Sequence, residues 1–200
     1  MIIPPSGAAP PKSPREVWSR LGPEAKHERL LNAATEVFAR RGLDAPMSEV
    51  AEAAGSGVAS IYRLYPSKHE LLSALVIRRM DQIAGAAADA ERRAGNGWTA
   101  LTGMLRWVVE TQSADDLMGE ARAAVAGRAD VEGATERAFA AWERLLTDAR
   151  AEGRLRADAT VLDLRLLFAA TRTAKRVEPQ HWPRMLELLI DALDTEPPAP

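Results

Sequence analysis

Hydrophobic residues recur along most of this chain every three or four positions, which is the spacing of helices with one buried face. Such stripes run through residues 23–41, 47–54, 57–64, 67–94, 98–112 and 130–152. Residues 14–21 are expected to add a helical turn. The pattern predicts an all-α protein of about nine helices.

The breaks between these stripes predict where the chain changes organisation. Four prolines in residues 1–13 predict a disordered leader, and residues 1–21 together are expected to form that leader or an arm. We expect one small helical domain over 22–66, a larger one over 67–194 and a tail over 195–200. Within the larger domain, Ser113 to Gly119 is predicted to be a polar turn, followed by a short Ala-rich helix to Ala126.

The last two helices carry apolar residues on nearly every side. Eight of the ten residues from Val161 to Ala170 are apolar, and so are seven of the nine from Met185 to Leu193. A helix of this kind needs cover on two sides. We therefore expect a two-fold homodimer with a four-helix interface; the alternative is that both helices form the core of a monomer. The interface residues predicted on these helices are Leu164, Leu167, Phe168, Met185, Leu186, Leu189 and Ile190.

Residues 46–66 have the pattern of a helix-turn-helix. A short helix ends at Ala54, and Gly55 and Gly57 are expected to turn the chain with positive φ. The second short helix, 57–64, would place Ile61 inward. In this geometry the second helix lies in the major groove of DNA. Small residues at its start would let it approach base edges closely: Ser56, Gly57, Ala59 and Ser60.

The start of the next helix is suited to binding phosphate. Ser67 and Glu70 form a predicted capping box, and Lys68 adds a positive charge at a helix N-terminus. Tyr62 and Tyr65, the only two tyrosines of the chain, lie just before it. Their hydroxyls are expected to donate to phosphate oxygens, although isolated tyrosines are more often surface packing residues.

Residues 27–76 resemble the DNA-binding domain of the TetR family of transcriptional regulators. Three motifs carry the resemblance: Ala34, Phe38, Ala39 and Gly42 in the first helix, the EVAEAAG segment from Glu49 to Gly55, and YRLYPSK from Tyr62 to Lys68. The resemblance implies a homodimer that binds an inverted repeat in double-stranded DNA and a helical C-terminal domain that binds a small effector. It also implies that Tyr62 and Lys68 hold phosphates, while bases are faced by Ser56, Val58, Ala59 and Ser60.

The sequence departs from the family pattern in three places. Pro46 replaces the usual capping Thr, so we expect Ser48 to supply the missing hydroxyl contact. Val58 stands where many members have a polar or basic residue, and Leu64-Tyr65 replaces His-Phe. The recognition helix therefore has few hydrogen-bond donors, and contacts with thymine methyl groups or readout of DNA shape must carry more of the specificity.

Charge and composition fit this interpretation. The formal net charge is −2, but residues 1–80 hold eleven Lys and Arg against eight Asp and Glu, whereas residues 81–200 hold fifteen against twenty. The front half is thus the basic half, which permits DNA binding. Secondary candidates for phosphate contact are Lys26 and Arg29, and Arg15 and Arg20 if the leader is an arm. The absence of cysteine, of a membrane-spanning stretch and of a signal peptide predicts a cytoplasmic protein with no membrane partner.

Aromatic and methionine residues in the second half can line an effector pocket. The predicted set is Met104, Trp107, Val108, Trp142 and Phe168, with Gln112 and Thr171 as polar contacts. Its character predicts an apolar or aromatic effector. Each residue taken alone is more often part of a core.

No pattern for catalysis, metal binding or a cofactor is present. The three histidines, at positions 27, 69 and 181, share no helix face, and no nucleotide-binding glycine motif follows a strand. We therefore expect no enzyme, no metal and no cofactor. The alternative to a DNA-binding regulator is a helical homodimeric interaction module, which would leave the Tyr62–Lys68 segment unexplained.

Overall fold

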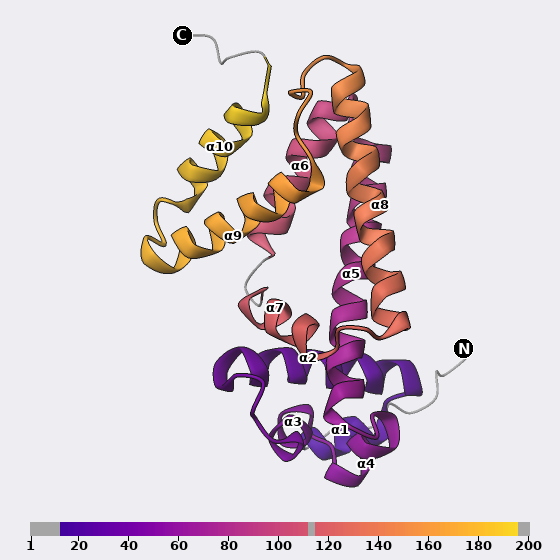
Figure 1. Ribbon diagram of the computed structural model, residues 1–200. Coiled ribbons are helices and arrows are strands. Elements are labelled where there is room, and N and C mark those ends of the chain that lie inside the picture. Colours follow the sequence, from indigo (N-terminus) through magenta and orange to yellow (C-terminus); the bar gives the residue numbers. More distant parts are fainter. Residues whose placement is uncertain (1–12, 112–114, 196–200) are drawn as a thin grey trace, which may run out of the picture. The chain divides into compact units, whose positions relative to one another are not determined.

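The computed structural model describes residues 13–111 and 115–195 and confirms the all-α class (Figure 1). An isolated bridge between Leu155 and Asp194 is the one strand-like pairing among these residues. The described helices are α1 Pro14–Arg20, α2 Pro23–Arg41, α3 Met47–Ala54, α4 Val58–Leu64, α5 Lys68–Arg93, α6 Gly97–Glu110, α7 Asp115–Ala124, α8 Ala129–Ala151, α9 Val161–Val177 and α10 Trp182–Leu193.

The chain divides into two compact units, with the boundary between Ala74 and Leu75. This boundary falls inside α5, a single helix from Lys68 to Arg93. In the first unit, α2 packs on α3 and α3 packs on α4. The α2 stripe is fully inward as predicted, with these side chains buried: Leu30, Leu31, Ala34, Val37 and Phe38.

The turn between α3 and α4 uses one left-handed glycine rather than two. Gly55 has φ 71° and ψ 24°, and its amide donates to the carbonyls of Ala51 and Glu52. Gly57 has φ −87° and ψ 147°, so the expectation of positive φ there was wrong. Gly57 serves as the N-cap of α4, a position that requires extended backbone rather than a left-handed one. The recognition helix therefore starts at Val58.

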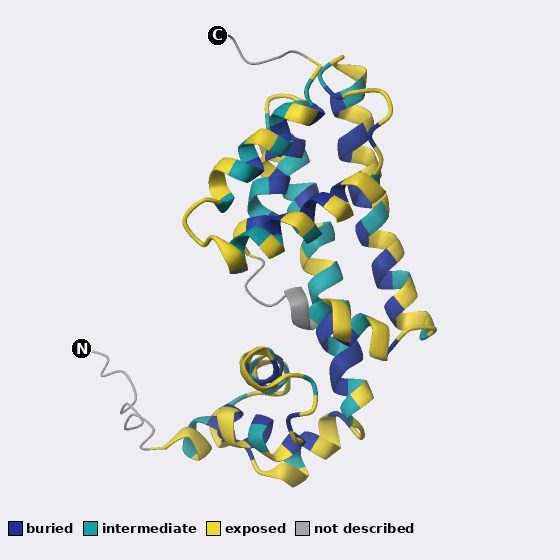
Figure 2. Cartoon of the chain, turned by 60° about the vertical axis from the view of Figure 1, so that its left-hand side comes forward, coloured by how far each residue is buried: buried dark blue, intermediate teal, exposed yellow. Residues whose placement is uncertain are grey.

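The second unit is a layered packing of long helices around one core. α6 packs on α8, α9 contacts both of them, and α10 packs on α9. Figure 2 shows buried residues on the inward faces of these helices and exposed residues on the outward faces. The predicted α6 stripe is buried at Leu101, Leu105 and Val108, whereas Trp98 is half-buried.

A carboxylate from the end of α8 closes the start of α6. Glu152 accepts hydrogen bonds from the backbone amides of Gly97 and, at 3.0 Å, Trp98, while Asn96 caps Thr99 at 2.7 Å. These amides have no partner inside the helix. Their hydrogen bonds lower the pKa of Glu152, mainly through the Gly97 amide and then through that of Trp98.

The polar turn predicted between Ser113 and Gly119 was wrong for its second half. Helix α7 begins at Asp115, five residues earlier than expected, and runs to Ala124. In a sequence, two consecutive acidic residues fit the first turn of a helix as well as a loop. The polarity of this stretch therefore marks a helix start instead of a loop.

The two C-terminal helices bury one side and expose the other. Leu164, Leu167, Phe168, Leu186 and Ile190 are buried within the chain itself, and Met185 and Leu189 are half-buried. Most of the side chains predicted for the interface thus pack in the core of their own chain, and their role in a dimer stays a prediction. The exposed apolar residues lie on the opposite sides of the two helices: Leu162, Leu166 and Val177 on α9, and Leu188 on α10.

Candidate DNA-binding surface and ligand pocket

The recognition helix α4 exposes the side predicted to face DNA. Ile61 is fully buried and anchors the helix, while Val58 is 42% and Tyr62 47% exposed. Ala59 is also exposed, and Ser60 is half-buried and accepts a hydrogen bond from Arg63 at 3.1 Å. The sequence analysis missed Arg63, whose exposed guanidinium adds donors to a helix that otherwise has few. Its place within the YRLYPSK motif was the available signal.

Two predicted DNA contacts are instead enclosed in the first unit. Ser56 is 5% exposed, and its hydroxyl lies 3.4 Å from the Ala51 carbonyl oxygen. Tyr65 is 4% exposed, and its hydroxyl lies 2.7 Å from Nδ1 of His27, with the two ring centroids 5.4 Å apart. These placements favour a packing role for both residues. The interpretation of Tyr65 as a phosphate donor is not supported by its position.

The start of α5 has the features expected of a phosphate site. Ser67 accepts the amide of Glu70 at 3.2 Å, as the capping box predicts. Lys68 is the first residue of the helix, and its Nζ lies 5.6 Å from the centroid of the buried Phe38 ring. Phe38 thus holds the Lys68 side chain close to the protein surface through a cation–π contact. Ser48, in the first turn of α3, is exposed.

The N-terminal helix α1 adds a positive residue beside this surface. A groove is lined by Arg15 of α1 together with the turn and the predicted contact residues Ser48, Gly57 and Val58. Arg20, by contrast, pairs with Glu16 at 2.6 Å. These positions favour Arg15 over Arg20 for the predicted arm.

The other secondary candidates have partners within the fold. Arg29 donates to the carbonyl of Ala54 at 2.6 Å, where it binds the end of α3. Lys26 lies 5.9 Å from the ring of Trp18. Arg29 is therefore best explained as a structural residue of the helix-turn-helix.

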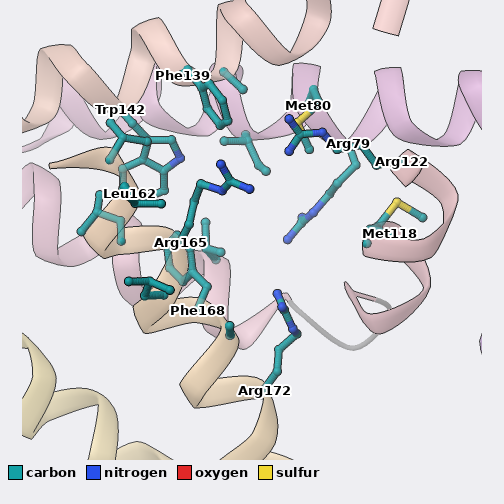
Figure 3. A pocket seen from close by; sticks show the side chains of 18 residues that line it. Arg79, Met80, Met118, Arg122, Phe139, Trp142, Leu162, Arg165, Phe168 and Arg172 are labelled. Carbon is teal, nitrogen blue, oxygen red and sulfur yellow. The ribbon is translucent and has the colours of Figure 1, made fainter. Parts of the chain in front are cut away.

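The second unit contains a cavity of about 360 Å³, a size typical of small-molecule sites. It is lined by residues of five helices, α5 to α9 (Figure 3). Of the predicted pocket residues, Val108, Trp142 and Phe168 line it, and the rings of Trp142 and Phe168 lie 5.5 Å apart. The structure thus brings together three of the seven residues proposed from the sequence.

The remaining predicted pocket residues lie elsewhere. Met104 is buried in the core, and Thr171 is fully buried and donates to the carbonyl of Leu167 at 2.8 Å. Trp107 does not line the cavity, but its ring lies 5.4 Å from the guanidinium carbon of Arg79, which does. Gln112 is outside the described residues.

Four arginines line the cavity, and the sequence analysis missed all of them. Arg165 and Arg172 of α9 reach into the open space, and Arg79 and Arg122 lie across from them (Figure 3). Burial lowers the pKa of Arg122 below its ordinary value, and the positive charge of Arg165 lowers it further. A signal was present in the sequence, since Arg165 and Arg172 are seven positions apart and share the helix face of Phe168.

Neither a metal-ion cluster nor a membrane-spanning helix is found among the described residues. They contain no group of three His, Asp or Glu side chains that could hold a metal ion. None of their helices is long and apolar enough to cross a membrane. The exposed surface of α4 and the start of α5 in the first unit suit a polyanion, and the cavity of the second unit suits a small molecule.

Comparisons with known proteins agree with this division. The sequence profile described as "Bacterial regulatory proteins, tetR family" matches residues 30–75. Comparison with curated proteins finds no match. Among solved structures, a TetR transcription regulatory protein from Mycobacterium vanbaalenii is 27% identical, with 86% of this chain and 96% of that chain covered and a TM-score of 0.65. A TetR transcriptional regulator from Streptomyces coelicolor is 25% identical, with 86% of this chain and 99% of that chain covered and a TM-score of 0.66.

A third structure, the ketosteroid transcriptional regulator of Mycobacterium tuberculosis, shares the fold at 21% identity with a TM-score of 0.64. The aligned region covers 86% of this chain and 96% of that regulator's chain. The matched segment, residues 30–75, contains α3, α4 and the first turns of α5. The remaining helices follow the fold of the regulators that cover most of the chain. Residues 30–75 of this protein therefore carry the sequence profile of bacterial TetR-family regulatory proteins, and the described chain has the fold of solved TetR transcriptional regulators.

Proposed function

We propose that this chain is a homodimeric repressor that binds an inverted-repeat operator and leaves it when a small molecule occupies the cavity. The observation that carries the DNA-binding part is the exposed face of α4 beside Lys68, within the segment that matches the family. Tyr62 and Lys68 would hold phosphates, and Val58, Ala59 and Ser60 would face bases. A regulator of this kind acts where the chromosome lies, in the cytoplasm.

The homodimer is supported by the unpartnered apolar side of the C-terminal helices. Leu162 and Leu166, one turn apart on α9, are 59% and 62% exposed, and Leu188 on α10 is 50% exposed. Side chains of this size and exposure, gathered on adjoining helices, mark an interaction surface. A two-fold dimer would cover them with their own copies and would place two recognition helices on successive major grooves about 34–36 Å apart.

The dimer can be tested by a single charge. Leu188→Glu, outside the cavity lining, should shift the protein from the mass of two chains to that of one in size-exclusion chromatography with light scattering. Ala140→Glu, at an exposed position of α8, is the matched control and should leave the mass unchanged. If Leu188→Glu keeps the mass of two chains, the exposed leucines are not the interface.

Release by a ligand is supported by the continuity of α5. The same helix begins at Lys68 and carries Arg79, Met80 and Ile83 into the lining of the cavity. About 16 Å of helix separates Lys68 from Arg79 at 1.5 Å per residue. A ligand changes operator affinity only if it binds one conformation of the protein more tightly than another.

Operator binding is best measured by fluorescence anisotropy with the DNA that flanks the gene, at about 0.15 M salt. Binding that resists a scrambled competitor, with an even number of chains per site, is the expected result. Equal, weak binding to both DNAs and to fragments selected from the whole genome would instead favour a helical interaction module.

A further inference from the structure

The charged side chains that line the cavity are all positive among the described residues. Arg79, Arg122, Arg165 and Arg172 line it, and no Asp or Glu is among its described lining residues. These arginines come from α5, α7 and α9, so the chain converges on the cavity from three directions (Figure 3). The other lining side chains are apolar, with Trp142, Phe168 and several leucines among them.

Arg122 and Arg165 are held against the same aromatic ring. Their guanidinium carbons lie 5.6 Å and 5.8 Å from the ring centroid of Phe139. Neither forms an ion pair with a carboxylate within residues 13–111 and 115–195. Burial and the repulsion from Arg165 both act against the charged form of Arg122, which is why its pKa is lowered. Two like charges, one on the half-buried Arg122 and one on the exposed Arg165, are thus kept near each other.

We propose that the cavity binds an amphipathic organic anion, with its carboxylate, sulfonate or phosphate between Arg122 and Arg165 and its apolar body against Trp142 and Phe168. The inference rests on the proposed ligand site and narrows its chemistry. It also revises the apolar effector expected from the sequence, because the arginines were not part of that expectation.

The alternatives to an anion are unfavourable on physical grounds. A neutral apolar ligand would remove water from the guanidinium groups of Arg122 and Arg165 without giving them a partner, which costs free energy. A cation would be repelled by both. An anion supplies a counter-charge for these two groups, and guanidinium groups form strong, paired hydrogen bonds with carboxylate and phosphate.

Arg79 shows how such a site is held in place. Its two terminal nitrogens lie 3.3 and 3.4 Å from the hydroxyl oxygen of Thr111, and its guanidinium stacks near Trp107. The side chain is therefore oriented before any ligand arrives, which reduces the entropy lost on binding. Trp107 thus contacts a lining residue, Arg79, without lining the cavity itself.

The test uses two fluorescent probes that share one aromatic skeleton. 1-Anilinonaphthalene-8-sulfonate carries a sulfonate, whereas N-phenyl-1-naphthylamine is its neutral counterpart, and both brighten in apolar sites. Titrated into the full-length protein, the sulfonate should bind about tenfold more tightly or better, as expected for charge-assisted hydrogen bonds. Calorimetry should give one sulfonate site per chain.

Matched variants locate the effect. Arg122→Gln and Arg165→Gln should each weaken sulfonate binding about tenfold and leave the neutral probe unchanged or tighter. Arg122→Lys keeps the charge and should retain part of the affinity. The control is Arg144→Gln on α8, whose side chain pairs with Glu91 outside the cavity lining and which should bind both probes as the unaltered protein does.

Melting temperatures, measured with and without the sulfonate probe, show whether a variant that binds weakly is still folded. Since Arg122 and Arg165 repel each other in the empty cavity, Arg122→Gln should raise the melting temperature of the ligand-free protein, and excess sulfonate probe should raise that of the unaltered protein more than that of the variant. A lower melting temperature for Arg122→Gln without ligand would contradict the repulsion on which the inference depends.

The outcomes separate this inference from the proposed function. Equal binding of both probes, or sulfonate binding unaffected by the Arg122 and Arg165 substitutions, overturns the anion site even if operator DNA is still bound and released. Arginine-dependent sulfonate binding sustains the anion site, whatever the operator assay shows. If that binding leaves the anisotropy of operator DNA unchanged, release by a cavity ligand is the part that fails.

Discussion

Gly55 lies where the turn of the helix-turn-helix meets α1. Replacing it with alanine should destabilise both the turn and the packing of α1. Its φ of 71° is left-handed, which costs an L-residue about 1–2 kcal/mol. A Cβ at this position would also lie 2.7 Å from both the Cβ and the backbone oxygen of Pro14, so α1 must move. Displacing α1 exposes Trp18, and losing the burial of a large apolar side chain costs about 1.5–3 kcal/mol. Gly55→Ala should therefore destabilise the first unit by about 2.5–5 kcal/mol.

Native-state hydrogen exchange, followed by mass spectrometry, can assign this loss to the first unit. Peptides from 13–66 should exchange faster in Gly55→Ala, whereas peptides from α8 should not change. Gly153→Ala is the matched control, because Gly153 has φ 75° and nothing within 4 Å of its added Cβ. It should show the backbone cost alone. Equal losses in the two variants, or unchanged exchange in α1, would refute the contact between α1 and the turn as a source of stability.

Three further predictions concern single side chains. Lys68→Ala should weaken binding to all DNA sequences alike and reduce the salt slope by about 0.9, measured by anisotropy; an unchanged slope would remove Lys68 from the phosphate contacts. Tyr65→Phe, which loses its bond to His27, should lower the free energy of unfolding by about 1 kcal/mol, whereas the exposed Tyr62→Phe should weaken operator binding without loss of stability. If urea melts showed the stability loss for Tyr62→Phe, and anisotropy the weaker DNA binding for Tyr65→Phe, the roles assigned to the two tyrosines would be wrong. Glu152→Gln should be less stable than the unaltered protein at neutral pH. Because hydrogen bonds lower the pKa of Glu152, its contribution is present above the ordinary value of 4.5 and is lost as pH falls through the folded value, so the two stability curves should converge in acid.

Much of the fold was predictable because it depends on local periodicity. The buried stripe of α2, the inward Ile61 and the cap at Ser67 follow from spacing along one helix. The start of α7 was misjudged because two acidic residues suit either a loop or the first turn of a helix. Only the backbone geometry distinguishes these.

The pocket was predicted less well because it depends on which helix faces meet. Trp107 and Trp142 looked equivalent in the sequence, yet only Trp142 lines the cavity, and Trp107 lies behind Arg79. Arginines are expected at the surface, so their convergence on one cavity is invisible without the packing of α5, α7 and α9. The same limit explains the interface: periodicity indicated that α9 has two apolar sides, but not which side the chain covers itself.

The apolar surface of α4 has a thermodynamic consequence for operator recognition. Val58 and Ala59 offer only methyl groups, so contacts there would exclude water from the thymine methyls of the major groove. Removing apolar surface from water gives association a negative heat-capacity change. The enthalpy of operator binding should consequently become more favourable on warming.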